Sequence, residues 1–374
     1  ARKLFFAAAW SPALANIVTI GFFCLLPLTK SGDNLSIDTV QNDQAAIWVL
    51  GLGTTLGIVV MAVVQGVAVL RHGMRFTFAP QFAHPAVKKL VQLSLWTLGY
   101  VAANQVALVV IKNLASPGSG GVDAYSKAFV LLQLPHGLLA VSIATTFVPD
   151  LARMFHRGDH QQFSRTMSSG IRLTALLTIP ASCGLLVMSK PIIGLLFQHG
   201  NFSAAATENT ARALSGLAIG LAGFSIYLFV LRGFYARNDT RTPFFINIGE
   251  NAINIVLAIV LVDRHGVLGL GLAFSIAYLV SALVALLVLE STEVDIKLSE
   301  LAFNIARISF AAGAMTCAVW FVIQYIGSDA GLGALTRVIA GTLIGVTTYV
   351  VALSALGEKT MRDYLSSKIT KSSR

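Results

Sequence analysis

The sequence predicts an all-α polytopic membrane protein with about ten transmembrane helices. Of its 374 residues, 55% are hydrophobic and only 12% are charged, and the mean hydropathy is +0.74. Soluble domains usually contain about 25% charged residues. The apolar residues also gather into stretches of roughly 20, the length that an α-helix needs to cross a bilayer.

Ten such stretches follow one another, separated by short polar segments. They cover residues 4–29, 46–70, 90–115, 124–148, 169–188, 211–231, 243–262, 266–289, 301–326 and 331–356. Nearly the whole chain is therefore expected to be helical and embedded in the membrane.

Lys and Arg gather at alternate ends of these spans. Counted from the N-terminus, the even-numbered ends hold 20 of the 27 Lys and Arg residues. Loops on the cytoplasmic side retain Lys and Arg, so both termini of this chain are predicted to be cytoplasmic. Residues 290–300 carry four acidic residues, but the rule counts Lys and Arg rather than net charge.

An internal repeat links the first two spans to the seventh and eighth. "SPALANI" (11–17) and "TPFFINI" (242–248) share a hydroxyl residue, Pro, three residues, Asn and Ile, and "VLGLG" opens the next span at 49–53 and at 267–271. The offset implies six-helix repeats, a transporter architecture with the substrate path between the repeats. We expect a two-lobed exporter architecture whose partial first lobe lacks its first four helices.

Polar side chains mark the third and fourth spans. The third span has a stripe at i, i+3, i+10 and i+11, formed by Ser94, Thr97, Asn104 and Gln105. The fourth contains Lys127, Gln133 and His136, which follows Pro135 at a predicted helix break. Interhelical hydrogen bonds, at roughly 0.6 kcal/mol each, would also explain the amides. Contact with outer-leaflet headgroups would explain Lys127, and a hydrogen-bonded core position would explain His136.

A charged turn separates the sixth and seventh spans. In "GFYARNDTRTPFFINI" (233–248), Arg237, Asp239 and Arg241 lie within five positions. Thr242 is predicted to cap the seventh helix with Pro243 at its first position. We interpret the three charged residues as a cytoplasmic gate or loop, and arginines that only fix the topology near anionic headgroups are the alternative.

The seventh span has a polar face. Its members lie at i, i+3, i+4 and i+7 and project within about a 100° arc of the helix: Asn247, Glu250, Asn251 and Asn254. An unpaired amide or carboxylate in hydrocarbon costs several kcal/mol, so this face must meet protein or water. Together with the polar residues of the third and fourth spans, it predicts a substrate cavity.

Four motifs in order carry a resemblance to a known family. They are "SPALANI" (11–17), "LPHGLLAVSIATTFVPDLAR" (134–153), "LFQHGNFS" (196–203) and "FYARNDTRTP" (234–243). From residue 1 to about 356 the chain resembles the bacterial lipid II flippases, the MviN or MurJ-like branch of the multidrug/oligosaccharidyl-lipid/polysaccharide exporters. In that family fourteen helices form two lobes and two extra C-terminal helices, and these ten would be the last ten.

The resemblance implies a domain organisation. Residues 1–75 would be the remainder of the N-terminal lobe and 76–290 the C-terminal six-helix lobe. Residues 291–357 would be two additional helices that form a groove for the lipid tail, and 358–374 a basic cytoplasmic tail.

The family resemblance also implies a function. The protein would flip lipid II, the undecaprenyl-diphosphate-linked peptidoglycan precursor, from the inner to the outer leaflet of the bacterial cytoplasmic membrane. Alternating access through a polar, cationic central cavity is the expected mechanism. The implied partners are lipid II, membrane lipids and cell-wall synthesis proteins.

Two positions depart from the family pattern. The cation that the family places on the fourth span aligns with Val130, and Lys127, one turn earlier, is a candidate substitute. Some members bind sodium on the seventh span; Asn254 matches the first of those positions, but Ala258 occupies the one a turn further on. We therefore expect no metal site, and no cofactor.

Other classes of function fit less well. An exporter of another lipid-linked glycan or of a drug would not be expected to carry both "LFQHGNFS" and "FYARNDTRTP". A membrane scaffold for cell-wall synthesis, joined through the basic tail to a further domain, is compatible with transport. An enzyme should show paired acids, a metal motif or a reactive loop His, which the sequence lacks.

The three cysteines are too scattered for a disulfide framework. The net charge of +10 follows from the loop bias, without the aromatic-interleaved basic patch of a nucleic-acid binder.

Overall fold

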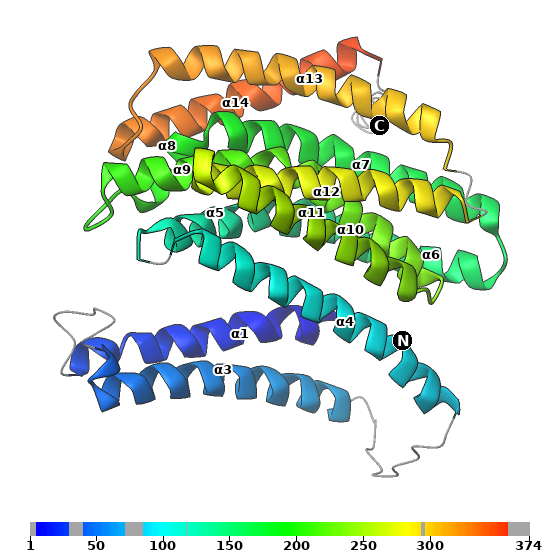
Figure 1. The fold of residues 1–374 in the computed structure, drawn as a ribbon, viewed down its shortest axis with the longest axis horizontal. Helices are drawn as coiled ribbons and strands as arrows, with labels where there is room; N and C mark the ends of the chain where they lie inside the picture. Colours follow the sequence, from blue (N-terminus) through cyan, green and yellow to red (C-terminus); the bar gives the residue numbers. More distant parts are fainter. Residues whose placement is uncertain (1–4, 30–39, 72–84, 117, 293–295, 358–374) are drawn as a thin grey trace, which may run out of the picture. The chain divides into compact units, whose positions relative to one another are not determined.

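The computed structural model describes residues 5–29, 40–71, 85–116, 118–292 and 296–357 (Figure 1). In these ranges the chain is helical, with short connections and no strand. Nine described helices are long and apolar enough to cross a membrane, and a bent helix pair makes a tenth span. The ten spans overlap the ten predicted stretches one by one, which confirms the prediction of an all-α, ten-span membrane protein.

The chain divides into two compact units, residues 1–82 and 83–374. In the first unit α1 (Phe5–Phe23) packs along α3 (Gln44–Arg71), and the short 3-10 helix η1 (Leu26–Leu28) follows α1. The helices approach closely at Gly57, where a Cβ would lie 2.9 Å from the carbonyl oxygen of Ala15. The Gln65 amide nitrogen donates to Ser11 Oγ at 2.8 Å, so a polar contact also joins the pair.

The second unit holds the remaining helices. They are α4 (Pro85–Leu114), α5 (Gly121–Pro135), η2 (His136–Val141), α6 (Ser142–His156), α7 (His160–Val187), α8 (Ser189–Phe197), α9 (Ala204–Ile219), α10 (Leu221–Ala236), α11 (Arg241–His265), α12 (Val267–Glu290), α13 (Leu298–Tyr325) and α14 (Gly331–Ala355). Successive spans run in opposite directions because short connections join them. We call the end with the α10–α11 turn the Arg237 end and the end with α8 the Lys190 end.

Two spans of the second unit are irregular. The α-helical pattern of α5 ends at Pro135 and continues as the π-helical turn η2, which is where the sequence predicted a break. The α9–α10 span bends by 47° at Gly220. Ser275 Oγ donates to the carbonyl oxygens of Gly216, at 2.6 Å, and Leu217, at 3.2 Å. One hydroxyl of α12 thus satisfies carbonyl groups just before the bend.

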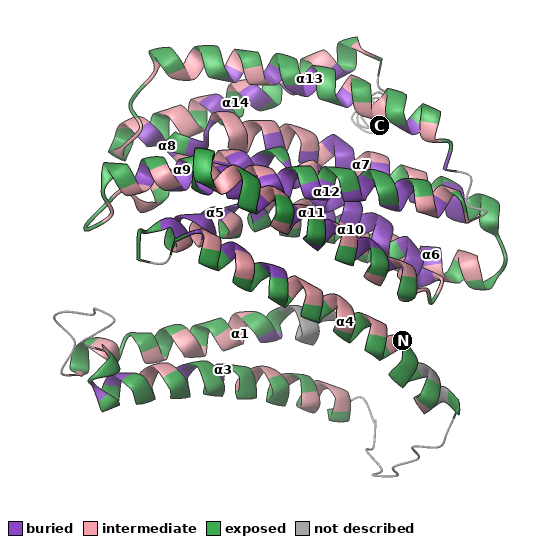
Figure 2. Ribbon diagram, in the orientation of Figure 1, coloured by how far each residue is buried: buried purple, intermediate pink, exposed green. Residues whose placement is uncertain are grey.

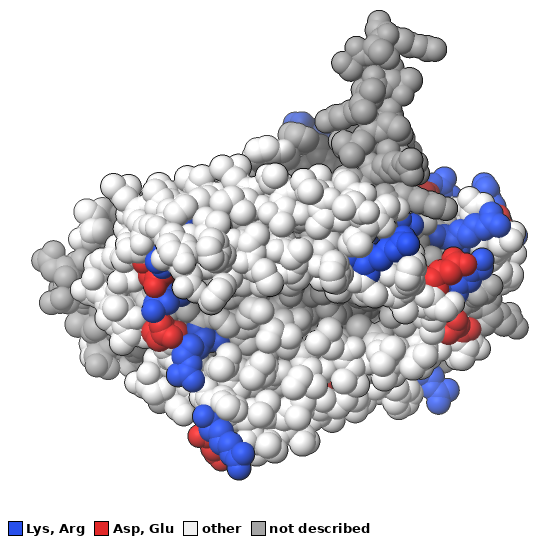
Figure 3. Space-filling model, turned by 90° about the horizontal axis from the view of Figure 1, so that it is seen from above, with Lys and Arg blue, Asp and Glu red and all other residues white. Residues whose placement is uncertain are grey.

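The core of the second unit lies between α7, α9, α10 and α12, whose facing sides are buried (Figure 2). Small residues admit large aromatic rings: a Cβ on Gly170 of α7 would lie 2.1 Å from Phe229 Cζ of α10. Many exposed residues of the spans are large and apolar, for example Leu98 and Phe310. On the face drawn in Figure 3, charged side chains gather at two ends and the surface between them is almost uncharged, as a surface in contact with lipid requires.

The start of α11 differs from the prediction. The helix begins at Arg241, its N-cap position is Thr240, and Pro243 is its third residue rather than its first. Asp239 Oδ1 accepts hydrogen bonds from the backbone N–H groups of Arg241 and Thr242, both at 3.0 Å. Thr242 as N-cap was therefore wrong: a charged carboxylate placed just before the helix satisfies the free N–H groups first.

Candidate functional site

The polar face of α11 is buried inside the second unit. Asn247 is 0% exposed and Glu250 1%, and Asn251 and Asn254 are also buried. The spacing of i, i+3, i+4 and i+7 places them on one side of the helix, which packs against α4. The face thus meets protein rather than lipid, as its desolvation cost requires.

Asn104 of α4 connects to this face. Its amide nitrogen and oxygen pair with the side chain of Asn247, each at 3.4 Å, and its oxygen also accepts from Asn251 at 3.4 Å. Asn247 in turn donates to Glu250 Oε2 at 3.4 Å. A chain of amides therefore crosses from α4 to the carboxylate on α11.

A cavity of about 90 Å³ lies beside the carboxylate. Aromatic side chains of α5 and α12, among them Tyr125, Phe274 and Tyr278, complete its wall together with Asn104, Glu250, Asn251 and Asn254. This volume holds several water molecules or a small ion, and it is too small for a glycan headgroup.

Two side-chain oxygens at this site have no hydrogen-bond partner among the described residues: Glu250 Oε1 and Asn254 Oδ1. A buried carboxylate is tolerated when it is protonated or when a cation or water compensates it. The unused acceptors therefore make this the place where a proton, water or small cation would be held.

The other predicted residues of the third span lie away from this cluster. Ser94, Thr97 and Gln105 are exposed, and Thr97 Oγ1 donates to the Leu93 carbonyl of its own helix at 3.1 Å. The side of α4 that meets α11 is centred on residues such as Trp96 and Ala107, and Asn104 stands at its edge. The polar stripe of α4 spreads over an arc of about 100°, which is wider than the strip of α4 that contacts α11, so only Asn104 reaches α11.

The fourth-span residues take three different positions. Gln133 is exposed, and His136 Nδ1 lies 3.0 Å from Ser225 Oγ at the π-helical turn. Lys127 forms an ion pair with Asp123 one turn earlier, and its ammonium lies 5.3 Å from the centre of the Phe202 ring. None of these three residues lines the cavity beside Glu250.

The arginines of the α10–α11 turn contact neighbouring helices. Arg237 donates to the side-chain and backbone oxygens of Thr292 at the end of α12, and its guanidinium lies 5.7 Å from the ring centre of Phe155 in α6. The guanidinium of Arg241 lies 5.7 Å from the Trp96 ring of α4. With Asp239 as the acceptor for the first N–H groups of α11, the α10–α11 turn also contacts α4, α6 and α12 at the Arg237 end.

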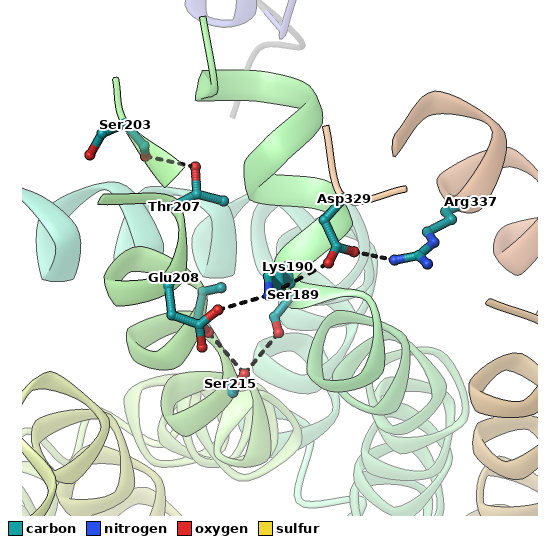
Figure 4. Close-up of polar contacts among 9 residues, drawn as sticks. Ser189, Lys190, Ser203, Thr207, Glu208, Ser215, Asp329 and Arg337 are labelled. Carbon is teal, nitrogen blue, oxygen red and sulfur yellow. Dashed lines mark hydrogen bonds and ion pairs between the residues drawn. The ribbon is translucent and has the colours of Figure 1, made fainter. Parts of the chain in front are cut away.

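A charge network that sequence analysis missed joins helices at the Lys190 end (Figure 4). Lys190 Nζ lies 3.0 Å from Glu208 of α9 and 3.6 Å from Asp329 of the α13–α14 loop, and Arg337 of α14 pairs with the same aspartate. The hydrogen bond with Glu208 raises the pKa of Lys190. Positions so distant in sequence give no periodic pattern, so only the fold reveals the network.

The fold is that of a polytopic membrane protein. Two solved structures share the fold at a TM-score of 0.50: a multidrug resistance MATE family transporter of the MOP superfamily, at 19% identity, and a MOP superfamily transporter from Pyrococcus furiosus, at 16%. Each covers 71% of this chain, and the chain covers 64% and 62% of them, respectively.

The particular family follows from the sequence. The family model described as "Lipid II flippase MurJ" matches residues 1–341, and the chain belongs to this family. A structure titled "Lipid II flippase MurJ, inward closed conformation" matches 96% of this chain and 69% of its own, with a TM-score of 0.71 and 23% identity. The predicted family resemblance is thereby confirmed.

Curated relatives agree with this assignment. A "Probable lipid II flippase MurJ" of Rhizobium meliloti is 30% identical over 93% of this chain and 63% of its own length. One of the same description from Vibrio cholerae is 28% identical over 82% of this chain and 59% of its own. The chain spans less than two thirds of the length of these relatives.

Proposed function

We propose that this chain takes part in moving lipid II from the inner to the outer leaflet of the bacterial cytoplasmic membrane, as a transporter and not as an enzyme. The observation that supports this most strongly is the family match over residues 1–341. The local feature that fits it is the buried polar face of α11, with unused acceptors beside a small cavity.

The proposed mechanism is alternating access. A diphosphate headgroup cannot cross hydrocarbon unaided, so a path must open that is polar and wet. We assign this path to the predicted substrate-cavity residues: Lys127, Gln133, Ser94, Thr97, Asn104, Gln105, Asn247, Glu250, Asn251 and Asn254. The cavity of about 90 Å³ would then be its narrow state, and separation of α4 from α11 would enlarge it.

The domain organisation and orientation are part of the proposal. Residues 1–75 and 76–290 would belong to two lobes, 291–357 would guide the lipid tail, and 358–374 would form a basic tail. Arg153, Arg157, Arg237, Arg241 and Lys297 share one end of the second unit, and the bias of Lys and Arg would place that end in the cytoplasm. Arg237, Asp239 and Arg241 would then form a cytoplasmic gate. Membrane lipids and cell-wall synthesis proteins are the proposed further partners.

Depletion of the full-length protein in its own bacterium tests this function. Lipid II should accumulate in the inner leaflet, and the fraction of lipid II that an impermeant reagent modifies from outside should fall. Expression of the wild-type protein should restore that fraction. Unchanged lipid II in both leaflets, with accumulation of another lipid-linked glycan, would instead assign the protein to a different exported substrate.

A further inference from the structure

Glu250 and Asn254 lie one turn apart on the buried face of α11, where i and i+4 side chains are neighbours. Their exposed fractions are 1% and 6%, and both line the cavity of about 90 Å³. Each has an acceptor oxygen, Glu250 Oε1 or Asn254 Oδ1, without a hydrogen-bond partner in the described part of the chain. Two neighbouring acceptors that lack a donor need one hydrogen between them, and a single proton on the Glu250 carboxyl would supply it.

An ionised carboxylate is poorly compensated at this position. Among the described residues, Glu250 accepts one hydrogen bond, from Asn247 to Oε2 at 3.4 Å, which is near the upper limit of length. None of the ion pairs between described residues includes Glu250. A buried negative charge with so little compensation carries a large desolvation cost, which a neutral carboxyl avoids.

The titratable groups around Glu250 are phenols. Tyr125 of α5 and Tyr278 of α12 share its cavity wall, and Tyr100 of α4 and Tyr227 of α10 lie within electrostatic range of it. A phenol is uncharged near neutral pH, so none of these groups offers a positive charge. The other members of the α11 face are neutral amides.

A metal cation fits the cavity less well than a proton. Hard cations in proteins commonly take about six oxygen ligands. The described wall offers two unused side-chain oxygens, and much of the remainder is aromatic or aliphatic, for example Ile111, Phe129 and Phe274. A proton needs only one atom to carry it and one acceptor, and this site has both.

We propose that Glu250 is a proton-binding site whose occupancy is linked to the separation of α4 from α11. In the narrow state, Glu250 Oε1 carries the proton and donates to Asn254 Oδ1. When the helices separate and water enters, the carboxyl O–H bond breaks, the proton passes to water, and the remaining carboxylate is hydrated. Return to the narrow state takes up one proton from water. The opening step rests on the proposed transport function, whereas the protonated carboxyl of the narrow state does not.

Infrared spectroscopy of the purified full-length protein tests for the bound proton. Near neutral pH, the difference spectrum between wild type and Glu250→Gln should contain the C=O band of a protonated carboxylic acid, and this band should shift in D₂O. Gln has the shape of a neutral Glu and keeps a donor, so the variant should fold.

The matched control is Glu208→Gln, the same change at a half-exposed carboxylate, which should leave the band in place. Absence of the band from the wild-type protein would overturn the proposal in favour of an ionised carboxylate with the Asn254 amide turned over to donate to it.

A change of salt separates a proton from a metal cation. Replacement of choline chloride by an equal concentration of sodium chloride, at constant pH, should leave the band unchanged. Loss of the band in sodium chloride would overturn the proposal in favour of a sodium site.

Spin labels on α4 and α11 test the link to opening. They are attached to Val106→Cys and Val256→Cys, both at exposed positions, after the three natural cysteines are replaced by alanine. Because opening releases one proton, the ratio of separated to narrow populations should rise with pH by up to about tenfold per unit. With Glu250→Gln it should change less than about twofold and favour the narrow state. An equal pH response with and without Glu250→Gln would refute the link.

Lipid II flipping by the reconstituted wild-type protein is measured separately. The infrared band and the pH-dependent separation without any flipping would overturn the proposed function and support the proton site. Flipping by a protein that lacks the band would overturn the proton site alone.

Discussion

The asparagines of the α4–α11 contact allow a test that separates structural hydrogen bonding from a transport role. Asn104 makes three side-chain contacts with Asn247 and Asn251, all at 3.4 Å. At roughly 0.6 kcal/mol for each interhelical bond in a membrane, Asn104→Leu should lower the free energy of unfolding by about 2 kcal/mol. Asn254 Oδ1 has no hydrogen-bond partner among the described residues, so Asn254→Leu should lower the free energy of unfolding by less than about 0.5 kcal/mol.

Transport should instead be impaired more by Asn254→Leu than by Asn104→Leu. Leu at Asn254 would fill part of the cavity of about 90 Å³ and remove a polar group from its wall. Complementation by Asn254→Leu in the full-length protein should therefore fail although the protein is inserted and abundant. The control is Asn113→Leu, the same change at an exposed position of α4, which should preserve both stability and growth.

Thermal unfolding of the purified variants and growth after depletion of the wild-type protein are the two measurements. Normal growth with Asn254→Leu would refute the transport role of the α11 face. A loss of stability in Asn254→Leu as large as in Asn104→Leu would show that the face is structural.

Two further predictions concern single charges, and a third concerns the orientation in the membrane. Lys127→Ala and Lys127→Glu should impair complementation, and Lys127→Arg should retain it. Only Arg preserves the ion pair with Asp123 and the contact with the Phe202 ring, which together are worth about 1 kcal/mol. Equal growth of all three variants would remove Lys127 from the site. Glu208→Gln should lower the unfolding free energy by less than about 1 kcal/mol near neutral pH, since Lys190 and Glu208 are both about half exposed. The pKa of Lys190 is raised in the folded protein, so the stabilisation is complete below its ordinary value of 10.5 and is lost as pH rises through the folded value. A stability difference between wild type and Glu208→Gln that grows at high pH would contradict this. A cysteine at Asn201 should react with an impermeant thiol reagent from outside and one at Arg157 should not, and the reverse pattern would overturn the proposed orientation.

The spacing of polar residues predicted their burial correctly where a whole helix face packs against its neighbours. The i, i+3, i+4, i+7 pattern of α11 predicted a face that must avoid lipid, and all four residues are buried. The same reasoning placed Ser94, Thr97 and Gln105 with Asn104, but only Asn104 reaches α11. Spacing defines a side of one helix, whereas the width of the contact depends on the crossing of two helices, which one sequence does not contain.

The other features could not be predicted, either because two neighbouring residues compete for the same cap or because the contacting residues are far apart in the sequence. The sequence placed the cap of α11 at Thr242, but Asp239 accepts the hydrogen bonds instead, and both residues are acceptable caps by type alone. The bend at Gly220 depends on Ser275, 55 positions later in the chain. The network of Lys190 joins three separate segments, and the aromatic wall of the cavity comes from helices that share no motif.

The strength of the contacts along α11 bears on how the proposed path could open. Contacts of 3.4 Å between amides are near the upper limit for hydrogen bonds, so each contributes little. At the Arg237 end, the Phe244 and Phe245 rings of α11 lie 5.2 and 5.8 Å from the Trp96 ring of α4, and the Arg241 guanidinium lies 5.7 Å from the same ring. Breaking the three hydrogen bonds would therefore add only about 2 kcal/mol to the cost of separating the helices, which is within the gap of a few kcal/mol that alternating access requires. The Asn104→Leu variant measures this cost directly, and a loss well above about 2 kcal/mol would mean that the contact is too strong to open in each transport cycle.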